Sequence, residues 1–174
     1  MTMRLGLSVF LSLLLAAVIA SPVSAHQPVT LLDSDTTPNA GPLLADGTVS
    51  FAIRASFSKA GQKKAFRAAL KGGDKLAVQY LIIDRKPENS LKNSLLPQLV
   101  ITTPSGKKIR IKFSERTTFY ERYSGTNYLY LSRFEGLAEA GIYQFVATSR
   151  ARASITIAVG EREVPGEVIR GPVR

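Results

Sequence analysis

The chain has 174 residues, and its 23 Lys and Arg outnumber its 13 Asp and Glu, which gives a formal net charge of +10 at pH 7. It contains no cysteine, which excludes disulfides and thiolate metal sites, and its single histidine excludes most triad chemistry. We therefore expect neither an enzyme nor a cofactor. The excess of positive charge favours an anionic partner, namely an envelope polymer, a membrane surface or an acidic protein, or it serves solubility alone.

The first 25 residues have the pattern of a secretory signal peptide. Arg4 precedes an apolar run from Leu5 to Ala20, and the small residues of Val23-Ser24-Ala25 follow. The run is short for a membrane span. This pattern predicts cleavage before His26 and a protein that is secreted or periplasmic, so nucleic acid is not an expected partner. The absence of cysteine in an exported protein favours a bacterial source.

Residues 26–47 are rich in Thr, Asp, Pro and Gly and predict an extended lead-in segment. From residue 48 to residue 57 the pattern changes to a period of two, with apolar residues at every second position from Val49 to Phe57. This alternation predicts a half-buried strand. Residues 64–70 fit either a short helix or a strand. We favour the strand, because a turn at residues 71–74 and a strongly apolar β run at residues 75–83 follow.

Residues 84–97 are polar and predict a long loop, and residues 98–103 predict a strand that ends in the turn Pro104-Ser105-Gly106. Residues 108–113 then alternate, which predicts a hairpin arm with a buried and a basic face. The inward set is Ile109, Ile111 and Phe113. The outward set is Lys108, Arg110 and Lys112.

Three further runs, at residues 128–134, 141–148 and 154–160, predict strands, and residues 161–174 predict a flexible tail. Repeated short strands separated by turn residues are typical of two packed sheets. The sequence therefore predicts an all-β domain over residues 48–160, folded as an antiparallel β-sandwich of the jelly-roll or immunoglobulin-like kind.

Three segments in this order resemble bacterial pre-peptidase C-terminal domains: residues 73–78 (GDKLAV), residues 99–106 (LVITTPSG) and residues 140–146 (AGIYQFV). The resemblance covers roughly residues 61–159. It implies a jelly-roll-like sandwich that acts as a non-catalytic accessory or binding module of secreted proteins. The acidic residues that usually precede the middle strand of that family are replaced here by Pro97 and Gln98, so the resemblance does not extend to a calcium or polar site there.

Two groups of basic residues are candidates for a cationic binding face. Lys64 and Arg67 represent the first group, and the outward set Lys108, Arg110 and Lys112 represents the second. Tyr128 and Tyr130 could stack on sugar rings beside such a face. The alternative is that these residues are only the solvated positions of strands, where lysine protects sheet edges.

His26 supports an alternative function, because cleavage before it would place an α-amino group and an imidazole on one residue. These two nitrogens could bind Cu(II) in an envelope copper-handling protein, with Asp33 or Asp35 as further ligands.

The carboxylate pairs Glu115 with Glu121 and Glu135 with Glu139 could in principle serve a glycosidase. We interpret them as solvated surface groups.

Overall fold

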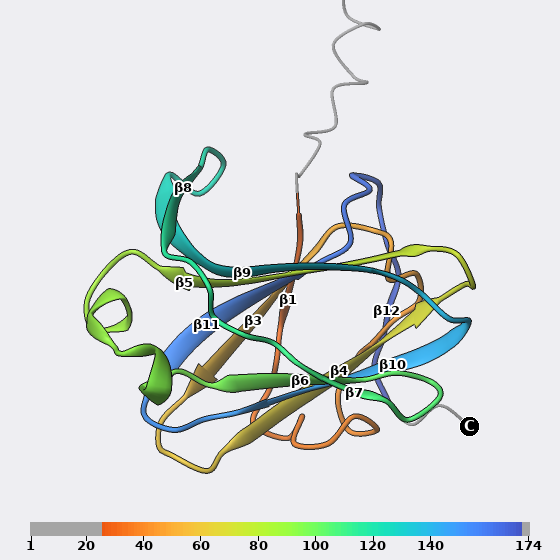
Figure 1. Cartoon of the computed structure of the whole chain (residues 1–174), viewed down its shortest axis with the longest axis horizontal. Helices are drawn as coiled ribbons and strands as arrows, with labels where there is room; N and C mark the ends of the chain where they lie inside the picture. The colour runs from red at the N-terminus through yellow and green to blue at the C-terminus, as the bar shows by residue number, and fades with distance from the viewer. Residues whose placement is uncertain (1–25, 172–174) are drawn as a thin grey trace, which may run out of the picture.

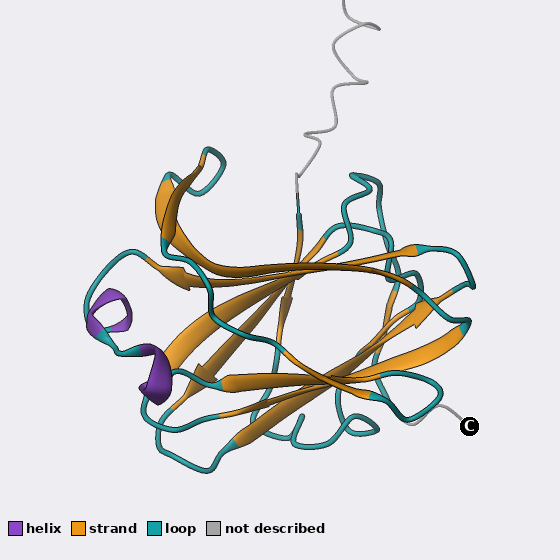
Figure 2. Cartoon of the chain, in the orientation of Figure 1, coloured by secondary structure: helices purple, strands orange, loops and turns teal. Residues whose placement is uncertain are grey.

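The computed structural model describes residues 26–171, so the predicted signal peptide at residues 1–25 lies outside the described residues. The described chain is all-β, and its only helical elements are the 3-10 turns η1 (Glu88–Ser90) and η2 (Asn93–Leu95) (Figure 2). Within residues 26–171, no helix is long and apolar enough to cross a bilayer.

The strands form two six-stranded sheets, which Figure 1 shows as two layers. The first sheet has the order β1-β3-β11-β5-β9-β8 and the second has the order β12-β2-β4-β10-β6-β7. The bounds are β1 Gln27–Thr30, β2 Leu43–Leu44, β3 Phe51–Phe57, β4 Lys63–Leu70, β5 Lys75–Ile83, β6 Gln98–Thr102, β7 Lys108–Arg110, β8 Thr117–Glu121, β9 Thr126–Leu137, β10 Gly141–Thr148, β11 Ala153–Val159 and β12 Val168–Ile169.

Both sheets are mixed, which corrects the prediction of purely antiparallel pairing. β1 runs parallel to β3, with Val29 opposite Ile53, and β2 runs parallel to β4, with Leu43 opposite Arg67. Both parallel strands come from the segment that was predicted as a lead-in. Pro28 does not prevent pairing, because β1 lies at the edge of its sheet, where one side needs no partner.

The strands predicted from a period of two are confirmed, and their apolar faces meet in one core. In β3, Phe51, Ile53, Ala55 and Phe57 are all buried. Residues 63–70 form a strand, β4, as favoured above. Its Phe66 stacks on Phe145 of β10, with 4.4 Å between ring centroids.

The predicted arm at residues 108–113 is a strand only as far as Arg110, but its two faces are as expected. Ile111 is buried, and Ile109 and Phe113 pack against the core at partial exposure. Phe113 lies against the ring of Tyr80, with 4.7 Å between ring centroids. Lys108, Arg110 and Lys112 are exposed.

The segment predicted as a flexible tail contacts the rest of the chain within its described part. β12 pairs with β2, the amide of Arg162 donates to the carbonyl of Thr48 at 2.9 Å, and Gly166 lies against the ring of Phe51. The C-terminal segment therefore closes one edge of the second sheet and covers part of the core.

Candidate functional site

A hollow of about 240 Å³ lies on the outer face of the first sheet. Its floor consists mainly of short side chains from the central strands: Ala52, Thr156 and Ala158, with Leu81 beside them. Its aromatic wall is formed by Phe119, Tyr123, Tyr128 and Tyr130. Its polar groups include His26, Arg54, Gln79 and Glu121.

The sheet register explains why these residues share one face. Arg54 of β3 lies opposite Thr156 of β11, Thr156 lies opposite Leu81 of β5, and Leu81 lies opposite Tyr130 of β9. Residues directly opposite one another in a ladder point to the same side of the sheet. A row of outward side chains therefore crosses four strands. In the neighbouring row, Ala52 lies opposite Ala158, and these short side chains leave the space that the hollow occupies.

The aromatic wall belongs to the hairpin of β8 and β9, which curves away from the upper layer in Figure 1. Phe119 lies opposite Tyr128 in this hairpin, and its ring is 5.2 Å from that of Tyr130. The guanidinium of Arg133 lies over the ring of Tyr130, 4.4 Å from its centroid. These contacts hold the rings in place beside the floor.

Glu121 stabilises the tip of the hairpin. Its carboxylate accepts hydrogen bonds from the backbone amides of Tyr123 and Ser124, both at 2.7 Å. Burial acts to raise the pKa of Glu121, but the hydrogen bonds from Ser124 and Tyr123 outweigh it, and the pKa is lowered. Glu121 is thus held ionised as a structural acceptor, which does not suit a general acid.

His26 borders the hollow at the start of the described chain, and its Nδ1 forms a hydrogen bond with the hydroxyl of Ser50. Burial lowers the pKa of His26, while the carboxylates of Glu163 and Glu121 act in the opposite direction. In residues 26–171, no group of three or more His, Cys, Asp or Glu could hold a metal ion. The Nδ1 of His26, one of the imidazole nitrogens available to copper, is engaged by Ser50.

A second hollow of about 330 Å³ continues the first one along the strands. The two share Arg54, Ser124, Tyr128 and Thr156. The second extends toward Ser56 and Arg85. Together they form a groove on the outer face of the first sheet, and we refer to both hollows below as the outer groove.

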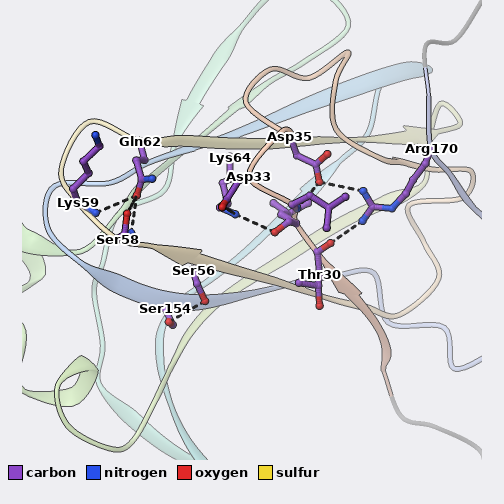
Figure 3. Close-up of polar contacts among 12 residues, drawn as sticks. Thr30, Asp33, Asp35, Ser56, Ser58, Lys59, Gln62, Lys64, Ser154 and Arg170 are labelled. Carbon is purple, nitrogen blue, oxygen red and sulfur yellow. Dashed lines mark hydrogen bonds and ion pairs between the residues drawn. The ribbon is translucent and has the colours of Figure 1, made fainter.

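Two of the predicted basic site residues, Lys64 and Arg67, are buried, which corrects their assignment to an exposed cationic face. Lys64 is 5% exposed, and its ammonium donates to the carbonyl of Leu31 at 3.1 Å and to Asp33 at 2.9 Å (Figure 3). Arg67 is 4% exposed and donates to the carbonyl of Gly41. The segment before β2 covers both side chains.

Figure 3 also shows how that covering segment is fixed. Arg170 donates to Asp35 at 3.1 Å and to the carbonyl of Thr30 at 2.7 Å. Asp35 is buried and also accepts the amide of Leu32. Asp33 and Asp35, which were considered as copper ligands, are therefore bound to Lys64 and Arg170.

The other predicted site residues do not come together on one surface. Lys108 and Arg110 lie on β7 of the second sheet and Lys112 follows that strand, whereas Tyr128 and Tyr130 line the outer groove of the first sheet. The prediction of the two tyrosines as ligand contacts remains a prediction, and its setting is now the groove.

Sequence reasoning missed Arg54 and Phe119 as site residues, and it considered Glu121 only as one of a pair of carboxylates. Arg54 was recognisable as an outward position of its strand, because it is the polar residue between the inward Ile53 and Ala55. Nothing in the local pattern indicates that β8 and β9 curve over this position.

No model of a known protein family matches the chain, and no curated protein matches it significantly.

Proposed function

We propose that this protein is a secreted, non-catalytic binding module of the bacterial envelope or exterior that holds a sugar polymer in the outer groove. The proposal includes export by the signal peptide at residues 1–25 and a β-sandwich of the jelly-roll or immunoglobulin-like kind. The likeness to pre-peptidase C-terminal domains is consistent with such a role. The observation that carries the proposal is the aromatic wall over a floor of small side chains.

This lining suits a saccharide because a sugar ring has both apolar and polar edges. Its C–H face can pack on a tyrosine ring, while its hydroxyls need hydrogen-bonding groups at the sides. Phe119, Tyr128 and Tyr130 offer the rings. Gln79 and the phenolic hydroxyls offer the polar partners.

A binding role also fits the state of the carboxylates that were considered for catalysis. Each forms a hydrogen bond or ion pair: Glu115 with Arg133, Glu121 with the amide of Ser124, Glu135 with Lys75 and Glu139 with Ser105. The pKa values of Glu115, Glu121 and Glu139 are lowered. Catalysis of glycoside hydrolysis needs a carboxylic acid whose pKa is raised.

Tyrosine fluorescence offers a direct test, because the chain has six tyrosines and no tryptophan. We expect titration with at least one polymer from a panel of dextran, xylan and polygalacturonate to change the emission. Replacing Tyr128 by Ala removes a wall of the groove and should weaken that binding about tenfold, since one aromatic contact contributes about 1.5 kcal/mol.

The matched control is Tyr120→Ala, because Tyr120 lies on the same hairpin, is 56% exposed and does not line the groove. It should leave the affinity unchanged. Thermal melts of both variants show whether the hairpin remains folded. Binding of none of the polymers, or equal losses in the two folded variants, would contradict the proposal.

A second candidate function is electrostatic docking to an anionic membrane or polymer through Lys108, Arg110 and Lys112. The observation in its favour is that all three are exposed and that none forms a salt bridge with the described part of the chain. Such attraction is long-ranged and weakens as salt rises. It needs no groove, so the position of the contact on the protein separates the two functions.

A further inference from the structure

The outer groove contains a cation that forms no ion pair with any described residue. Arg54 projects from β3 between the two hollows and is exposed. Among residues 26–171, no side chain forms an ion pair or hydrogen bond with its guanidinium. Its neighbours across the ladder, Thr30 and Thr156, are uncharged.

The two acidic groups that border the groove are committed elsewhere. The carboxylate of Glu121 accepts the amides of Tyr123 and Ser124, and that of Glu88 accepts the amide of Ser154 at 3.1 Å. Neither carboxylate pairs with Arg54, so the N–H groups of its guanidinium remain available to a ligand in the middle of the groove. A guanidinium beside aromatic rings is suited to a carboxylate or sulfate, which it can bind through two parallel N–H groups.

The shape of the groove indicates an extended ligand. The two hollows meet at Arg54, and their floor follows β3 from Ala52 to Ser56, a distance of about 13 Å along a strand. Space is open on both sides of the guanidinium, so the charged group of the ligand need not be terminal. The rings of Phe119 and Tyr130 line the first hollow, on one side of Arg54, and Arg85 lines the second hollow, on the other side.

We propose that the ligand is an acidic sugar chain whose carboxylate or sulfate is bound by Arg54, while a neighbouring sugar ring of the same chain packs against the aromatic wall. This inference rests on the proposed function. It adds that the polymer is acidic and that Arg54 binds its charged group. Arg54 then determines specificity for charge, and Tyr128 contributes affinity for any sugar chain.

The test compares polygalacturonate, its methyl ester and dextran sulfate by calorimetric titration at physiological salt. The first two polymers have the same sugar backbone and differ in charge. We expect the wild-type protein to bind polygalacturonate or dextran sulfate at least about tenfold more tightly than the neutral ester, since a charge-assisted hydrogen bond contributes about 1.5 kcal/mol or more. Tight binding of polygalacturonate indicates a carboxylate ligand, and tight binding of dextran sulfate alone indicates a sulfate.

The variant Arg54→Gln should lose this preference, with its affinity for the acidic polymer falling to that for the ester. Its matched control is Arg110→Gln, which removes one exposed arginine from the second sheet and should keep the preference. Equal wild-type affinity for acidic and neutral chains, or an unchanged preference in Arg54→Gln, would overturn the inference while leaving the proposed function standing. Failure to bind any polymer, neutral or acidic, would overturn both.

Discussion

Charged residues of this protein occupy three different environments. Lys64 is buried and bound to Asp33, Arg54 is exposed in a groove, and Lys108 is exposed on the other sheet. A buried charge requires partners, and removing one partner leaves the other at a high cost. Lys64 is therefore a structural residue, and the surface charge that can act on a ligand is smaller than the composition indicates.

His26 provides a prediction about pH at the residue scale. Burial lowers its pKa from the usual value of 6.5, so the unfolded chain binds the proton more tightly than the folded one. Stability from neutral His26 is thus fully present above about pH 6.5 and is lost as the pH falls through the lower folded-state pKa. We expect the stability advantage of the wild-type protein over His26→Gln to be larger at pH 8 than at pH 5, as measured by urea unfolding at both pH values. An advantage that grows toward pH 5 would contradict this assignment.

At the scale of the elements, the strands with a clear period of two could be predicted. In β3, for example, the alternation of apolar and polar residues indicates which side of the strand faces the core. β1, β2 and β12 could not, since each is short and forms only against a distant partner. The burial of Lys64 and Arg67 has the same origin. It depends on the segment before β2 covering β4, and no local pattern around these residues contains that information.

The close fit of this covering segment can be tested at Gly41. A Cβ atom there would lie 1.9 Å from the carbonyl oxygen of Ala65 on β4, so the segment must move away if Gly41 becomes Ala. We expect Gly41→Ala to destabilise the protein by about 1–3 kcal/mol, as overpacking does. The control is Gly72→Ala, where the nearest atoms lie at 3.8 Å and the change should be below about 1 kcal/mol. Chemical denaturation measures both, and equal stabilities would show that the segment does not pack tightly on β4.

At the scale of the whole molecule, the two sheets expose different surfaces. The first sheet carries the outer groove with Tyr128 and Arg54, and the second carries Lys108 and Arg110 at its β7 edge. The tyrosines could be selected from the sequence as candidate sugar contacts, because aromatic residues in an outward row are suited to stacking. The groove itself could not be predicted, since it depends on the curved hairpin of β8 and β9 and on a register shift between Tyr80 and Leu81 of β5.

The central claim is that the outer groove of the first sheet is the ligand site, and amide chemical-shift mapping tests it most directly. The isotope-labelled protein is titrated with short oligomers of the polymer that binds most tightly in the calorimetric titrations. We expect the shifted amides to cluster on β3, β5, β8, β9 and β11 around Arg54 and Tyr128. Amides of β6 and β7 on the second sheet should not shift. Shifts that centre on Lys108 to Lys112 instead, or a spectrum that the oligomers leave unchanged, would contradict the account.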